Sequence, residues 1–138
     1  MATWQQVISF EMEGRAARMQ EVSPVLDQFL ARAWGHDGIQ YWGPTDSNDV
    51  HVTFDTKTDE IEDMQFRVDL REPDRGFVER MIELAKQRGW KFRAEEAGVF
   101  EPELAAVIAV LRGSRAASFV RDPHQFFRDL ESRPLQSD

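Results

Sequence analysis

The sequence contains no cysteine among its 138 residues, and this absence excludes several kinds of chemistry. Without thiols there is no disulfide framework, no thiolate zinc site and no cysteine nucleophile. Long apolar runs are also missing: the longest, Leu104 to Leu111, has eight residues, whereas a membrane-spanning helix needs about 20. The N-terminus has neither the basic nor the apolar region of a signal peptide. We therefore expect a cytoplasmic protein with no membrane partner.

Basic residues are few compared with acidic ones. The chain has 17 Lys and Arg against 25 Asp and Glu, a formal net charge of −8. Nucleic acids and anionic membranes attract clustered positive charge, so we expect neither as a partner. The negative charge is also concentrated, because residues 46–74 hold ten acids and three bases, a net charge of −7. The sequence therefore predicts one acidic segment in an otherwise nearly balanced chain.

Hydrophobic periodicity predicts a single α+β domain that spans residues 1–138. Strands with alternating apolar and polar residues are expected at 4–12, 50–55, 63–70 and 90–95, and helices at 16–34 and 74–88. This β-α-β-β-α-β order is typical of ferredoxin-like folds, with an antiparallel sheet and helices on one face. The predicted core covers residues 1–96, and residues 97–138 are expected to add a helical extension packed on it.

Capping and turn residues predict where these elements begin and end. Ser23-Pro24 is expected to start a second piece of the first helix, which ends at Trp34. Asp74 is the expected N-cap of the second helix, and Gly89 its end. The other predicted features are a loop over Gly35–Asn48, a hairpin turn within Thr56–Glu60, a buried helix over Pro102–Arg112, a short helix over Ser114–Val120 and a helix starting at Asp122-Pro123.

Motifs for metal binding and catalysis are incomplete. Asp46–Val50 and Asp55–Asp59 begin like calcium loops, but Val50 and Lys57 stand at ligand positions and the glycine at the sixth position is missing. The three histidines lack zinc-ligand spacing. There is no Gly-x-Ser-x-Gly nucleophile motif and no glycine-rich phosphate loop. The sequence therefore predicts no catalytic residue, no metal and no cofactor.

Strand alternation places a polar set of side chains on the sheet face away from the helices. The candidate partner-binding residues on this face are Asp49, His51, Asp55, Asp63, Arg67 and Asp69. One interpretation is a solvated face held by weak cross-strand ion pairs. The other is a docking surface for a basic protein, because concentrated charge of one sign steers the encounter of two proteins.

An aromatic stretch forms a second candidate site. It comprises Trp34, His36, Asp37, Tyr41 and Trp42. An aromatic wall with a few polar groups suits a small-molecule pocket. The alternative is structural: Trp34 ends the helix, Tyr41 or Trp42 packs on the core, and His36-Asp37-Gly38 is a turn.

These features favour a non-enzymatic interaction protein. Its most concrete form is a bacterial inhibitor of the immunity type, which neutralises a basic toxin through the acidic face and a buried aromatic contact from Tyr41 or Trp42. One alternative is a small-molecule-binding or sensor domain that uses Gly35–Asn48. Another is an enzyme in which His36 and Asp37, or His51 with nearby carboxylates, act as acid and base. A monomer and a homodimer are both compatible with the apolar tail helix.

Overall fold

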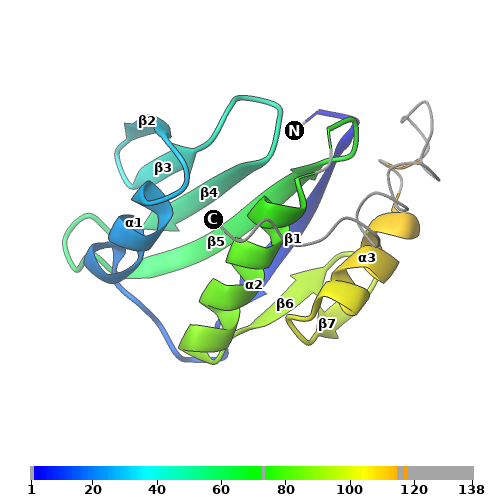
Figure 1. Ribbon diagram of the computed structural model, residues 1–138. Helices are drawn as coiled ribbons and strands as arrows, with labels where there is room; N and C mark the ends of the chain where they lie inside the picture. The colour runs from blue at the N-terminus through cyan, green and yellow to red at the C-terminus, as the bar shows by residue number, and fades with distance from the viewer. Residues whose placement is uncertain (1, 73, 115–116, 118–138) are drawn as a thin grey trace.

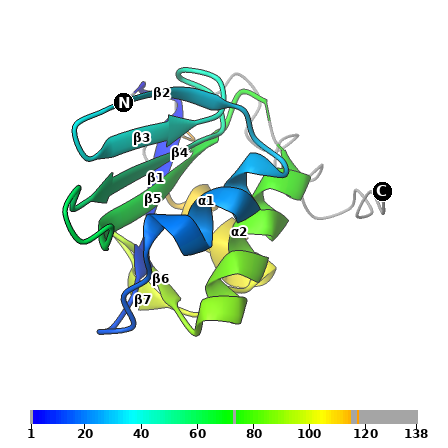
Figure 2. The same cartoon turned by 90° about the vertical axis from the view of Figure 1, so that its left-hand side faces the viewer.

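A seven-stranded antiparallel sheet is the centre of the computed structural model, which describes residues 2–72, 74–114 and 117 (Figure 1). The strands are β1 (Gln5–Glu11), β2 (Arg32–His36), β3 (Ile39–Trp42), β4 (Asp49–Phe54), β5 (Ile61–Asp69), β6 (Lys91–Ala94) and β7 (Gly98–Phe100). They lie in the order β2-β3-β4-β5-β1-β6-β7. The helices of the described residues are α1 (Met19–Asp27), α2 (Arg75–Arg88) and α3 (Leu104–Arg112). They lie on one side of the sheet, and no described helix covers the other side, which we call the open face (Figure 2). At one end of this face the loop before β4 folds over the sheet, where Gln5 Nε2 donates to the Ser47 carbonyl oxygen.

The prediction of a small α+β domain with an antiparallel sheet is confirmed, but the ferredoxin-like topology is not. The four predicted strands correspond to β1, β4, β5 and β6, and the strand order differs because β2, β3 and β7 extend the sheet at both edges. Gly98–Phe100 pairs with β6, so the sheet continues past residue 96 and the predicted start of the helical extension is wrong.

The first helix and the long loop after it were predicted wrongly. α1 begins at Met19, contains Pro24 within the helix and ends at Asp27, so Trp34 lies in a strand. The loop predicted over Gly35–Asn48 contains the turn between β2 and β3. Asp37 and Gly38 both have positive φ angles, 38° and 85°, as a two-residue type I′ turn requires. A Cβ atom at residue 38 would lie 2.6 Å from the Phe54 carbonyl oxygen, so this position needs glycine.

The other helix boundaries agree with their capping signals. The Asp74 side chain accepts a hydrogen bond from the Phe77 N–H at 2.9 Å, and Gly89 ends α2 in the left-handed conformation. α3 buries one side, through Val107, Ile108 and Leu111, and not several sides as predicted. The turn between β4 and β5 falls at residues 56–58, within the predicted range. The helix predicted at Asp122-Pro123 lies outside the described residues, as does most of the one at Ser114–Val120.

The core lies between the sheet and the helices. Aromatic rings at its centre meet edge to face: Phe10 lies 5.3 Å from Phe92 and 5.6 Å from Phe66 between ring centroids. Alternation along each strand sends one set of side chains into this core and the other set to the open face. Among the described residues, no helix is both long and apolar enough to cross a membrane.

Candidate functional site on the open sheet face

A row of side chains crosses the open face in register. Tyr41 of β3 is opposite His51 of β4, which is opposite Gln65 of β5. The row continues through Ser9 of β1 to Arg93 of β6. Directly opposite residues of antiparallel strands have Cβ atoms about 4.5–5.5 Å apart on the same face. This row is thus aromatic toward β2 and polar at its centre, and it ends at Arg93, which is paired with Glu11 of the same face at 3.7 Å.

Three rings stack at the aromatic end of this row, and we call them the aromatic ladder: Trp34, Tyr41 and His51. The ring centroids of Trp34 and Tyr41 are 4.6 Å apart, and those of Tyr41 and His51 are 4.3 Å apart with only 13° between the planes. The guanidinium of Arg67 lies 5.8 Å from the centroid of the Tyr41 ring. Trp34, on the edge strand, is 51% exposed. The ladder therefore runs from His51, on a central strand, to the solvent-exposed Trp34 at the edge of the sheet.

The surroundings of His51 favour its neutral form. The amide nitrogen of Gln65 lies 3.2 Å from Nδ1, so this amide donates and the ring proton is assigned to Nε2. Nε2 is buried and has no hydrogen-bond partner among the described residues. Burial lowers the pKa of His51 below its ordinary 6.5, the positive charge of Arg67 lowers it further, and Asp63 and Asp49 oppose both effects. An imidazole that is neutral and covered at Nε2 is poorly placed to exchange a proton with a substrate.

This lowered pKa predicts a specific pH dependence of stability. Below about pH 6.5 the unfolded chain protonates His51 while the folded protein keeps it neutral, so stability falls as pH decreases through 6.5 toward the folded pKa. His51→Phe, which keeps the stack on Tyr41, is expected to show a flatter profile. The difference cannot exceed about 1.4 kcal/mol per pH unit, the limit for one proton. Urea unfolding of both proteins between pH 7.5 and 5 measures it, and parallel profiles would contradict the assigned neutral state.

Asp49 and Arg67 form a buried ion pair beside the ladder. Arg67 Nε donates to Oδ1 of Asp49 at 2.6 Å, and Nη2 donates to Oδ2 at 2.8 Å. Asp49 is 2% exposed, and Gln5 Nε2 is 3.4 Å from the same Oδ2. Burial raises the pKa of Asp49 above 3.8, against the opposing effect of Arg67. Asp49 and Arg67 were expected to present their charges to a partner, but these charges instead neutralise each other within the protein.

Asp69 is also buried, contrary to its predicted exposure. Nε and Nη2 of Arg71 each donate to its carboxylate at 3.1 Å, and its backbone N–H donates to Asn48 Oδ1 at 2.9 Å. The guanidinium of Arg71 in turn lies 3.8 Å from the centroid of the Trp4 ring. Asp69 therefore fixes the loop before β4 to the end of β5, and no local pattern of residues predicts this polar cluster.

The exposed acids of this region are at the end of the β4–β5 hairpin. Asp55 caps the turn by accepting the N–H groups of Lys57 and Thr58, which lower its pKa. Glu60, Glu62 and Asp63 are exposed, and Asp63 lies on the open face opposite Thr53. We call Glu60, Glu62 and Asp63 the acidic hairpin. Of the six predicted partner-binding residues, Asp63 is the carboxylate that presents its charge to solvent on this face.

The five residues of the aromatic stretch do not form one pocket. Trp34 and Tyr41 stack on the open face, whereas Trp42 is fully buried on the helix side, with its Nε1 donating to Asp27 at 2.9 Å. His36 and Asp37 are at the exposed β2–β3 turn, 3.2 Å apart between Nε2 and Oδ2. Trp42 therefore belongs to the core, and its predicted role as a contact for a ligand or partner is wrong.

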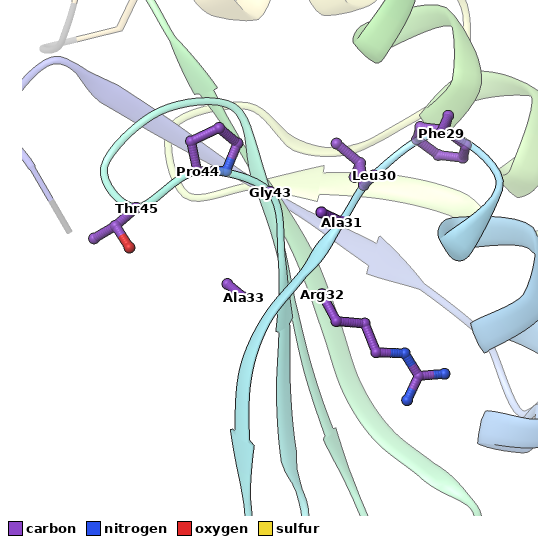
Figure 3. A pocket seen from close by; sticks show the side chains of 8 residues that line it. All are labelled: Phe29, Leu30, Ala31, Arg32, Ala33, Gly43, Pro44 and Thr45. Atoms are coloured by element: carbon purple, nitrogen blue, oxygen red, sulfur yellow. The ribbon is translucent and has the colours of Figure 1, made fainter.

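A hollow of about 500 Å³ lies at the edge of the sheet, between the start of β2 and the loop after β3 (Figure 3). It is lined by Phe29, Leu30, Ala31, Arg32, Ala33, Gly43, Pro44 and Thr45. The sequence could not indicate it, because Phe29 to Ala33 have the spacing of a helix. Among the described residues, no group of three or more His, Asp or Glu side chains is arranged to hold a metal ion.

The fold and this site define the molecule as a small α+β protein in which the described helices cover one face of the sheet. No protein-family model matches the sequence, and neither curated proteins nor solved structures give a match. Its interpretation therefore depends on the geometry and charge of the open face.

Proposed function

We propose that this chain is a non-enzymatic interaction protein that docks a basic protein partner through the open face and the adjoining acidic hairpin. In its most concrete form it is a cytoplasmic bacterial inhibitor of the immunity type, which neutralises a basic toxin. The observation that carries the proposal is the position of the described helices, which all lie on one side of the sheet and leave most of the other side without a described segment over it (Figure 2).

The chemistry of the open face supports docking better than catalysis. Most of its charges are already paired, as in Asp49 with Arg67 and Glu11 with Arg93 at 3.7 Å. A partner would meet a preformed surface of rings and amides, which loses little side-chain entropy on binding. The acidic hairpin at its border would supply long-range attraction, which raises association rates for a partner of opposite charge.

Reversing the charge of the acidic hairpin is expected to abolish capture of a basic partner. Glu62→Lys combined with Asp63→Lys removes the attraction and leaves the buried ion pairs intact. The matched control is Glu83→Lys with Glu103→Lys, which makes the same change in net charge on exposed residues of the helix side. Immobilised wild type and both variants are exposed to a lysate of the cells that encode the protein, and the retained proteins are identified by mass spectrometry.

The proposal requires a basic protein that wild type and the control retain and the hairpin variant loses. With that protein purified, its association rate should fall with salt for the wild type and much less for the hairpin variant. Equal retention by both variants would contradict docking at this surface. Retained partners that are acidic would contradict the charge argument.

A further inference from the structure

The edge strand β2 carries Trp34, the exposed end of the aromatic ladder, next to an apolar hollow. All five residues of β2 are exposed, and among the strands that the structure describes it pairs with β3 alone. One face of Trp34 stacks on Tyr41, and half of the residue remains in solvent. Beside it, Ala33, Pro44 and Thr45 line the hollow on the side of β2 away from α1, whereas Arg32 points to the other side (Figure 3). An exposed tryptophan and an apolar recess therefore lie within a few residues of each other.

We propose that this β2 edge is the contact surface for a second copy of the same chain. Two β2 strands pair antiparallel about a two-fold axis at Trp34. The aromatic ladder then continues through the tryptophans of both copies, and each tryptophan covers the Ala33 side of the other copy's hollow. A two-fold contact needs one patch that is complementary to itself, and a projecting ring beside a recess on one strand meets this condition.

The charges along β2 favour this antiparallel arrangement. Arg32 is near the start of the strand, where it is held by Asp27 and its side chain is half exposed, and Asp37 follows the end of the strand beside His36 and is 88% exposed. Antiparallel pairing about Trp34 sets Arg32 of one copy opposite His36 of the other and next to its Asp37. Parallel pairing would set like charges together. In addition, residues 28–36 contain no acid, so this edge is a place where two copies of net charge −8 can approach closely.

The size of the surface sets the strength of the contact. The five residues of β2 and the hollow give fewer residues than the about 20–30 per partner of a standard interface. The dimer is therefore weak and reversible, and it forms at high protein concentration. The contact shares Trp34 with the open face but lies apart from the acidic hairpin, so the charge-reversal variant that tests the proposed function leaves this contact unchanged.

Sedimentation equilibrium of the full chain from about 10 µM to 1 mM tests the proposal. Wild type is expected to shift from monomer to dimer over this range. Trp34→Ala, which ends the stack, and Ala33→Arg, which places a bulky cation at the contact, should each weaken association by at least about tenfold. Asp37→Lys should weaken it as well, because it brings a second cation beside Arg32. Val99→Ala is the matched control: Val99 is 48% exposed on the opposite edge strand, and its loss should leave the dimer unchanged.

Two results would overturn the proposal. The first is a monomer at every concentration. The register shift between Arg32 and Gly35 would then be a bulge that bends the edge strand and prevents pairing with another chain. A dimer that persists in both Trp34→Ala and Ala33→Arg would place the contact elsewhere. Circular dichroism of each variant confirms that it is folded, and the acidic hairpin variant should dimerise like the wild type, which separates this test from that of the proposed function.

Discussion

Replacing Arg67 by Met is expected to lower the free energy of unfolding by about 3–5 kcal/mol at pH 7, because it leaves the Asp49 carboxylate buried without its countercharge. Both hydrogen bonds of the pair are lost, and Asp49 is 2% exposed, so solvent cannot replace them. The matched control is Arg93→Met on the same face. The ion pair of Arg93 with Glu11 is long, at 3.7 Å, and more than half exposed at the arginine. Its loss should cost less than about 1 kcal/mol.

The loss in Arg67→Met should also depend on pH. Burial already raises the pKa of Asp49, and without Arg67 it rises further. A carboxyl group whose folded pKa is raised stabilises the protein below its unfolded pKa, near 3.8, and this contribution disappears as pH rises through the folded pKa. The variant should therefore lose less stability at pH 5 than at pH 7, as measured by urea unfolding.

A double variant separates the cost of an unpaired charge from the value of the pair. Asp49→Leu with Arg67→Met replaces both charges by apolar groups, and its stability should return close to that of the wild type, because burying the ionised pair also has a cost. If the double variant is as unstable as Arg67→Met alone, the instability comes from lost packing and the argument about charge is wrong.

Trp42→Ala is expected to destabilise the protein by about 3–5 kcal/mol, because it removes a fully buried ring from the core. Trp42→Phe keeps most of the buried ring but loses the hydrogen bond from Nε1 to Asp27. The loss of this bond should lower the free energy of unfolding by about 1 kcal/mol, and the smaller ring adds a loss of packing. Trp34→Ala is the comparison, since Trp34 is half exposed at the sheet edge. Denaturant unfolding at low protein concentration measures all three. A small effect of Trp42→Ala would contradict the assignment of this ring to the core.

The sequence predicted the centre of the fold well because the signals there are local. Val50, Val52 and Phe54 alternate strictly with polar residues, and their partner strand does the same, so the hairpin of β4 and β5 and its two faces were predictable. Asp74 and Gly89 are strong capping residues, and both ends of α2 follow them.

The β2–β3 hairpin was missed although a signal for it was present. Leu26, Phe29, Leu30 and Trp34 have the spacing of a helix face, and this spacing concealed the strand. The Asp37-Gly38 pair is a typical two-residue hairpin turn, and Ile39 and Tyr41 alternate after it. The Asp37-Gly38 pair therefore favours a shorter first helix and a larger sheet than the helix spacing alone predicts.

The candidate site shows a more general limit of prediction from strand alternation. Alternation correctly assigned Asp49 and Asp69 to the open face, but alternation gives the direction of a side chain and not its exposure. Their burial depends on Arg67, which is opposite Asp49 only in the observed register, and on Arg71, whose long side chain folds back over Asp69. The stack of Trp34 on Tyr41 likewise depends on a hairpin that was not predicted.

The carboxylate of Asp27 has a consequence for local unfolding. This last residue of α1 accepts hydrogen bonds from Nε and Nη2 of Arg32 in β2 and from Nε1 of Trp42 in β3. An edge strand paired on one side opens more readily than a central strand, but here opening also breaks contacts with the end of the helix. We therefore expect the C-terminal turn of α1, β2 and β3 to open together. A molecule that binds the β2 edge is then expected to stabilise β3 and the end of α1 as well, which hydrogen exchange of the α1 amides would measure.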